Sequence, residues 1–96
     1  MKIEWDDAKD RANQRKHGIG FQESSELFES GVAYLEIFDD EHSVTEDRFI
    51  ALGPLRRGMV LVIWTQRDDD TIRIVSARRA TKREHAMYLA YVENSK

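Results

Sequence analysis

The segment that decides the fold is MVLVIWTQRDDDTIRIVSARRATKREHAMY, residues 59–88. It opens with six consecutive apolar residues, 59–64, the longest such run in the chain, which is typical of a central strand covered on both faces. Three aspartates supply a turn at residues 68–70, and the alternation at residues 71–78 predicts the next strand. Because so short a connection cannot make a parallel crossover, we expect these two strands to pair antiparallel.

Two helices are predicted before this segment. Asp6 or Asp7 offers an N-cap for the first helix, which has acidic residues in its first turn and basic residues in its last turn. A glycine at the end, Gly18, marks its stop. The second helix, FQESSELFES at residues 21–30, is short and amphipathic and precedes Gly31.

The remaining strand candidates are short and rich in β-branched and aromatic residues: IEW, VAYLEIF and RFIALGPL, at residues 3–5, 32–38 and 48–55. From Ala80 onward, helical spacing predicts a C-terminal helix that packs back on the sheet through Met87, Tyr88 and Tyr91. The sequence therefore predicts an α+β fold, in which an antiparallel β-sheet meander is accompanied by two N-terminal helices and a C-terminal helix.

Length and composition limit the classes of protein to consider. A chain of 96 residues makes one domain, residues 1–96, and its 41% hydrophobic and 34% charged residues are typical of an ordinary folded domain. The absence of cysteine excludes disulfides and cysteine-ligated metals and fits a reducing compartment. No segment is long and apolar enough to cross a membrane, and the first residues lack the apolar core of a signal peptide. We therefore expect a soluble cytoplasmic protein that does not contact membranes.

The formal net charge of -3 hides a strong segregation of charge along the chain. Residues 1–54 hold 6 Lys or Arg against 13 Asp or Glu, a net charge of -7, whereas residues 55–85 hold 8 against 4, a net charge of +4. A local positive surface of this kind binds polyanions whatever the total charge is. The basic segment is therefore a candidate binding surface for a nucleic acid.

Strand periodicity predicts which side chains share a face. On the first of the two strands these are Met59, Leu61, Ile63, Thr65 and Arg67; on the second, one face holds Ile72, Ile74, Ser76 and Arg78, and the other holds Arg73, Val75 and Ala77. If the faces that end in Arg67 and Arg78 lie on the same side of the sheet, a polar patch forms at its margin from Thr65, Arg67, Ser76 and Arg78. The alternative is that both arginines extend over the rim into water without a specific role.

Four segments in this order resemble the BrnT family of bacterial type II toxins: EWDDAKDRANQRKHGIGF, HSVTEDRFIALG, LVIWTQR and RIVSARRATKREHAMY, at residues 4–21, 42–53, 61–67 and 73–88. The most specific pieces are the W-D and K-H-G of the first segment, Glu46-x-Arg48, Thr65-x-Arg67, and the R-I-V-S-A-R that begins at Arg73. Together they span nearly the whole chain.

This resemblance implies a small ribonuclease with a RelE-like fold, an antiparallel sheet flanked by helices, whose cleavage of RNA blocks translation. It also implies a partner, an antitoxin of the BrnA kind encoded in a neighbouring gene. Such an antitoxin is dimeric, inhibits the toxin and binds operator DNA, so that the toxin contacts DNA only through it.

Cleavage of RNA without a metal requires a base for the 2′-hydroxyl, cations for the extra charge of the transition state, and an acid for the leaving oxygen. Arginine suits the second task because its planar fork contacts two phosphate oxygens, so Arg67 and Arg78 are the predicted phosphate clamps. Lys16 adds a point charge. The predicted proton carrier is His17, with Glu46 as a rival base and Tyr88 as a possible helper. The remaining candidates for RNA binding are Arg73, Arg79, Lys82, Arg83, Thr65 and Ser76.

Each of these assignments has a structural alternative. Lys16 and His17 lie in the last turn of a helix, where cations offset the helix dipole. Glu46 and Arg48 are two residues apart on a predicted strand, and the alternative for them is that they simply form cross-strand ion pairs. His42 lies among loop carboxylates without a second histidine at ligand spacing, so we predict neither a metal nor another cofactor. Two other functions also stay open: an RNA-binding module without catalysis, which needs only the basic segment, and a partner-binding regulatory protein, which needs only the acidic half.

Overall fold

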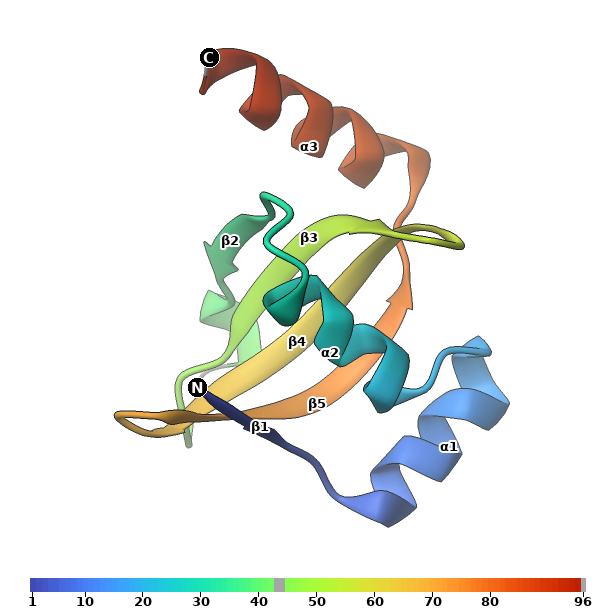
Figure 1. Cartoon of the computed structure of the whole chain (residues 1–96), viewed down its shortest axis with the longest axis vertical. Coiled ribbons are helices and arrows are strands. Elements are labelled where there is room, and N and C mark those ends of the chain that lie inside the picture. The colour runs from blue at the N-terminus through green and yellow to red at the C-terminus, as the bar shows by residue number, and fades with distance from the viewer. Residues whose placement is uncertain (43–44, 96) are drawn as a thin grey trace.

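The computed structural model describes residues 1–42 and 45–95 and contains three helices and five strands (Figure 1). The strands are β1 (Lys2–Glu4), β2 (Leu35–Phe38), β3 (Phe49–Leu55), β4 (Gly58–Asp68) and β5 (Thr71–Arg79). The helices are α1 (Asp7–His17), α2 (Phe21–Glu29) and α3 (Lys82–Asn94), and a 3-10 turn, η1 (Asp40–His42), follows β2. The predicted elements are therefore present, with the strand expected at residues 32–38 shortened at its start.

The five strands form one sheet in the order β1-β5-β4-β3-β2. Strands β2 to β5 pair antiparallel in sequence order, which confirms the predicted meander and the α+β class. The N-terminal strand, for which the sequence predicted no place in the sheet, pairs with β5 in parallel register, with Lys2 opposite Thr71 and Glu4 opposite Arg73. The sheet is consequently mixed, with a parallel strand at one edge.

The first helix has the ends that its sequence predicts. The Asp6 carboxylate accepts a hydrogen bond from the backbone N–H of Lys9 at 2.9 Å, and Gly18 takes the left-handed conformation, φ 73°, that ends the helix. A side chain of the same helix then caps the next one, because Asp10 Oδ1 accepts from the backbone N–H of Phe21 at 2.8 Å. Helices α1 and α2 are thus joined by a hydrogen bond as well as by the short connection between them.

The larger apolar core lies between α2 and the sheet, which the helix crosses in Figure 1. It includes Phe21 and Leu27 of the helix and the central residues Val62 and Trp64 of β4, all buried. Helix and sheet approach each other closely at Gly53, where an added Cβ atom would lie 2.7 Å from Cδ1 of Leu27. A larger residue there would force the Leu27 side chain to move.

A smaller core on the opposite face is covered by α3. Leu52, Leu61 and Tyr88 are buried in it, and the Tyr88 hydroxyl donates to the carbonyl of Ala33 at 2.8 Å. Of the three side chains predicted to pack on the sheet, only Tyr88 is buried, since Met87 is 44% exposed and Tyr91 37% exposed. The helix contacts the sheet through a narrow stripe instead, formed by Glu84, Tyr88 and Val92.

Two irregularities in the β4–β5 ladder change the predicted faces. Ile63 pairs with Ser76 and Trp64 with Ile74, so Val75 is an extra residue in β5. Ile72 and Ile74 therefore belong to the core under α2, not to the face of Ser76 and Arg78, so the predicted alternation along residues 72–78 is wrong. The second irregularity leaves Arg67 without a partner, between the Gln66–Ile72 and Asp68–Thr71 pairs.

Candidate functional site

Helix α1 is attached to β5 by one amide side chain. Asn13, which is 7% exposed, donates through Nδ2 to the carbonyls of Ile19 and Ala77, both at 2.8 Å, and accepts through Oδ1 from the backbone N–H of Ala77 at 3.2 Å. The Ser76 hydroxyl lies 3.4 Å from the same oxygen. Strand β1 pairs with β5 only as far as Arg73. Beyond that point, the side-chain amide of Asn13 takes the place that the backbone of a longer β1 would fill.

A pocket of about 290 Å³ opens beside this contact. Val75, the extra residue of β5, and Ser76 form its strand side. The α1 side presents two cations, Lys9 and Lys16, and the imidazole of His17, together with Ala12 and Asn13. No carboxylate lines the pocket. An anion with several oxygen atoms, such as a phosphodiester, therefore finds cations, a hydroxyl and an imidazole around it.

Arg78 lies two residues beyond Ser76 on the same strand, about 6.5 Å along it. Its guanidinium forms a two-point ion pair with Glu84 of α3, from Nη1 to Oε1 at 2.8 Å and from Nη2 to Oε2 at 2.9 Å. The Nη1 group also donates to the Arg79 carbonyl at 3.1 Å. Because an arginine carries five N–H donors, the Nε–H and one Nη2–H remain for a phosphate.

Glu84 has a second task, since it is also part of the cap of α3. Its Oε1 accepts from the backbone N–H of Thr81 at 2.8 Å, and the Thr81 hydroxyl accepts from the backbone N–H of Glu84 at 3.1 Å, which completes a capping box. The hydrogen bond from Arg78 is the main cause that lowers the pKa of Glu84 to about 2, with further contributions from Thr81. The carboxylate is thus ionised at neutral pH and fixes the orientation of the Arg78 fork.

Three further cations surround the start of α3. Arg79 donates from Nη1 to the carbonyl of Arg57 at 3.0 Å, whereas the side chains of Lys82 and Arg83 are exposed in the first helical turn. Arg57 is itself held by Glu23, at 2.9 and 2.7 Å. We call Arg78, Arg79, Lys82 and Arg83 the basic corner; it adjoins the α1–β5 pocket through Ser76.

The polar patch predicted from Thr65, Arg67, Ser76 and Arg78 is not a single patch. Arg78 is opposite Leu61, six residues from Arg67 along β4, so the two arginines are separated by about 20 Å of strand. One phosphate cannot contact both. At the far end, Thr65 donates to the carbonyl of Asp47 at 2.7 Å, and Arg73 pairs with Glu4 at 3.0 Å.

Arg67 differs from the other arginines of this face. It is exposed, and its side chain forms no hydrogen bond or ion pair with residues 1–42 or 45–95.

The other predicted proton carriers lie away from the pocket. Glu46 lies in a bend before β3 and has its Oε1 3.7 Å from Nε of Arg48. This contact joins two residues of the same segment, not the cross-strand pair that the alternative expected. Tyr88 uses its hydroxyl in the contact that holds α3. Trp64 is buried and Trp5 packs against the larger core, so both belong to the interior. His17, which is half-buried at the end of α1, is the proton carrier that lines the pocket.

Sequence reasoning missed Lys9, Asn13 and Glu84. The position of Lys9, seven residues before Lys16 on α1, places it on the same side of the helix two turns away, a signal that was available. Asn13 gave none, because the partner that ties it to the sheet is the backbone of Ala77, 64 residues away in the chain. The signal for Glu84 was the T-x-x-E of a capping box, residues 81–84.

The described part of the chain has no group of three histidine, cysteine, aspartate or glutamate side chains placed to hold a metal ion. The loop candidate His42 has no described side chain, and its neighbours Ser43 and Val44 lie outside the described residues. Among these same described residues, no helix has the length and apolarity that crossing a membrane requires.

Comparison with known proteins agrees with the motifs. Residues 5–84 match the profile of a family described as the ribonuclease toxin, BrnT, of a type II toxin–antitoxin system. Among solved structures, the crystal structure of the Brucella abortus ribonuclease toxin BrnT is similar, with a TM-score of 0.70 and 25% sequence identity over 85% of this chain and 99% of that chain. No match was found among curated proteins.

Proposed function

The chain belongs to the BrnT family of ribonuclease toxins of type II toxin–antitoxin systems, and from this premise we propose that it is an endoribonuclease that cleaves RNA without a metal ion and thereby inhibits translation. The observation that carries the proposal is the α1–β5 pocket, where Lys16, His17 and Ser76 meet, with Arg78 two residues beyond Ser76 on the same strand. We expect this chemistry to operate in the cytoplasm, where messenger RNA is translated.

The proposed reaction is an internal transfer at phosphorus. The 2′-oxygen of a ribose attacks the adjacent phosphorus while its proton passes to the His17 imidazole, and the bond from phosphorus to the 5′-oxygen breaks. A protonated group or water returns a proton to that oxygen, which leaves a cyclic phosphate and a 5′-hydroxyl. Arg78 and Lys16 stabilise the extra negative charge on the phosphorus oxygens, and Ser76 orients one of them.

The geometry favours different roles for the two predicted clamps. Arg78 is held by Glu84 next to the pocket, whereas Arg67 is exposed about 20 Å along the sheet. We therefore assign Arg78 to the transition state and Arg67, with Arg73, Arg79, Lys82 and Arg83, to the path of the RNA chain. Glu46 becomes a secondary candidate base, since Arg48 is its nearest charged partner.

An RNA cleavage assay tests this assignment. The purified protein should cut RNA in the presence of EDTA and yield cyclic phosphate ends. Replacing Arg78 or His17 with alanine should lower the cleavage rate by about 10²–10³, the usual effect of one transition-state contact, while Arg67→Ala should lower it by less than about tenfold.

Three results would contradict parts of the proposal. Activity that EDTA abolishes and a divalent ion restores would exclude the metal-free route. If Arg67→Ala and Arg78→Ala lower the cleavage rate equally, the two arginines do not have the different roles that we assign to them. Retarded but uncut RNA would indicate the alternative function, a binding module without catalysis.

Membership of this family also indicates a protein partner, the antitoxin. A type II toxin has a cognate antitoxin, and we propose that it is a BrnA-like dimer that covers the basic corner with acidic or mixed-charge groups and connects the toxin to operator DNA. If Arg67→Glu and Arg78→Glu both bind the antitoxin as tightly as the parent, inhibition acts away from these arginines.

A further inference from the structure

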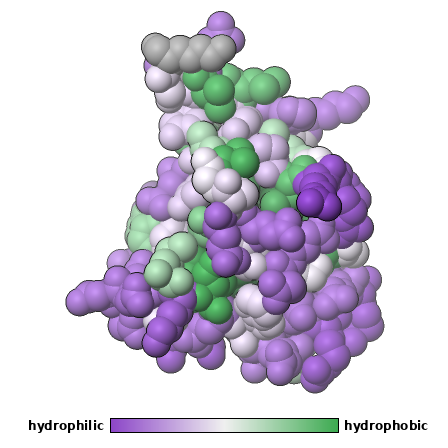
Figure 2. All heavy atoms as spheres, in the orientation of Figure 1, coloured by the Kyte–Doolittle hydropathy of each residue, from purple (hydrophilic) through white to green (hydrophobic). Residues whose placement is uncertain are grey.

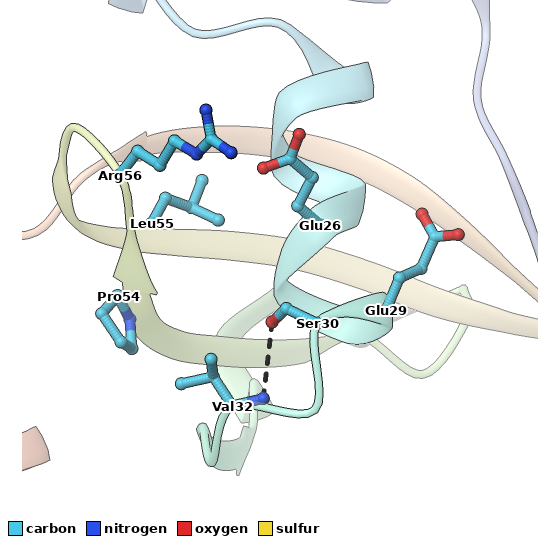
Figure 3. Close-up of a pocket in the computed structure, with 7 residues that line it drawn as sticks. All are labelled: Glu26, Glu29, Ser30, Val32, Pro54, Leu55 and Arg56. Carbon is cyan, nitrogen blue, oxygen red and sulfur yellow. Dashed lines mark hydrogen bonds between the residues drawn. The ribbon is translucent and has the colours of Figure 1, made fainter.

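The C-terminal end of α2 borders a pocket of about 480 Å³ that none of the preceding roles uses (Figure 3). Its floor is apolar, formed by Val32, Pro54 and Leu55, and Val32 is 41% exposed. Figure 3 shows Glu26 across the mouth from Arg56 of the β3–β4 turn, whereas Glu29 extends toward the outer side of the helix. The pocket thus combines an apolar base with a charged rim.

The rim is electrostatically unbalanced. Glu26 and Glu29 contribute two negative charges and Arg56 one positive charge, which leaves a net charge of -1. Neither carboxylate forms an ion pair or a side-chain hydrogen bond within the described part of the chain. Both lie in the last turns of α2, where the helix dipole adds the equivalent of about half a negative charge.

The same helix is destabilised by this arrangement. Helix α1 has three basic residues in its last turn, but α2 has none, and Glu26 and Glu29 are a like-charge pair three residues apart. Both features weaken the isolated helix. Carboxylates that oppose the fold in this way are expected where a surface serves recognition.

We propose that the pocket binds an arginine or lysine side chain of the cognate antitoxin. The aliphatic stem of such a side chain covers Val32, Pro54 and Leu55, and its cationic end reaches Glu26, with Glu29 adding to the attraction. The volume exceeds that of one such side chain, so a neighbouring apolar residue of the same segment fits beside it. This inference relies on the toxin function only for the identity of the partner.

A charge-reversal experiment tests the pocket. The double variant Glu26→Lys, Glu29→Lys should bind the purified antitoxin of the neighbouring gene at least about tenfold more weakly than the parent, because like charges then face each other across the interface. A single reversal on α3, Glu93→Lys, serves as a control for altered net charge, since Glu93 is exposed and outside the pocket. It should change the dissociation constant by less than about twofold.

Two further measurements separate binding from folding and from catalysis. Lysines at the end of α2 favour the helix dipole, so the melting temperature of the double variant should be unchanged or about 2–6 °C higher. RNA cleavage should equal that of the parent, because neither glutamate belongs to the candidate RNA site.

A double variant that binds the antitoxin within about twofold of the parent overturns the proposal. A second variant, Val32→Ser, tests the apolar floor alone. If it binds the antitoxin as tightly as the parent, the aliphatic part of the antitoxin side chain does not contribute to binding. If the parent binds the antitoxin but cleaves no RNA, the proposed catalysis fails while the pocket is still judged by the binding data.

Discussion

At the scale of single residues, Asn13 decides how the pocket is built. Its carboxamide satisfies an acceptor on Ile19 and both a donor and an acceptor on Ala77, so helix α1 is held against a sheet edge that would otherwise have unpaired backbone groups. Lys16 and His17, one turn further along the helix, owe their position beside Ser76 to this contact.

We predict that Asn13→Ala lowers the free energy of unfolding by about 2–4 kcal/mol, since buried backbone groups lose their partners. Urea unfolding followed by circular dichroism measures this. Gln14→Ala, at an exposed position of the same helix, should change the stability by less than about 0.5 kcal/mol. If the two variants are equally stable, water replaces the amide and Asn13 does not fix α1.

The residue scale is also where sequence reasoning was least complete. Lys16, His17, Ser76 and Arg78 were selected from residue chemistry and family motifs. The fold brings the first three to one pocket, and Arg78 lies two residues beyond Ser76 on β5. Arg67 was selected by the same reasoning and lies elsewhere. The separation follows from the antiparallel pairing, because the end of β4, with Arg67, lies beside the start of β5, whereas Arg78 lies at the end of β5. The extra residue Val75 changes only the side-chain alternation along β5, and no local pattern in the sequence reports it.

At the scale of elements, α3 and the Arg78 fork form one unit through Glu84. The carboxylate closes the capping box of the helix and holds the guanidinium at two points. The N-terminus of α3 and the end of β5 are therefore fixed relative to each other.

This unit predicts a pH-dependent stability. Because the ion pair with Arg78 lowers the pKa of Glu84 from 4.5 to about 2, its contribution is complete above pH 4.5 and is lost as the pH falls toward 2. At pH 7, Glu84→Gln should lower the free energy of unfolding by about 1–2 kcal/mol, a value reduced by solvent screening because Arg78 is 37% exposed. The difference should nearly vanish at pH 2.

Urea unfolding at both pH values measures this prediction. Glu93→Gln, an exposed carboxylate on the same helix, should show no such pH-dependent difference. If Glu84→Gln lowers the free energy of unfolding equally at pH 7 and pH 2, the side chain acts through packing and not through its charge.

Most elements could be predicted because their signals are local. The caps at Asp6 and Gly18 and the apolar run of β4 were sufficient for α1 and the central strand. The parallel pairing of β1 was not predictable in this way, since its partner, β5, lies at the other end of the chain. The narrow contact between α3 and the sheet was not predictable either. Met87 is exposed, but its spacing along the helix is the same as that of a buried residue.

At the scale of the whole molecule, acidic and basic segments occupy different parts of the fold. The basic corner joins β5 to α3, whereas α2 and the segment before β3 carry mostly carboxylates. Figure 2 shows that much of one face of the molecule is strongly hydrophilic, with apolar groups gathered on the projecting α3. A chain with a net charge of -3 thus presents a local cationic surface.

We predict that RNA affinity depends on salt through the basic corner. Replacing Lys82 and Arg83 with alanine should reduce the slope of log K against log salt by about 1.4, the value for two phosphate contacts with single-stranded RNA. Binding titrations with a non-cleavable RNA at several salt concentrations measure it. Lys2→Ala, on β1 beside the start of β5 and away from the basic corner, should leave the slope unchanged. An equal reduction by both variants would mean that binding follows net charge alone.

The parallel pairing of β1 with β5 also has a consequence for the synthesis of the protein. A ribosome that adds about 5–20 residues per second makes Lys2 roughly 3–14 s before its partner Thr71. During this interval the sheet lacks an edge, α1 has no Ala77 to bind, and the pocket beside Ser76 does not exist. A ribosome-bound chain ending at Asp70 should therefore be cut by proteases within α1, whereas the released protein resists them. The pocket can therefore form only after the ribosome has made the residues of β5.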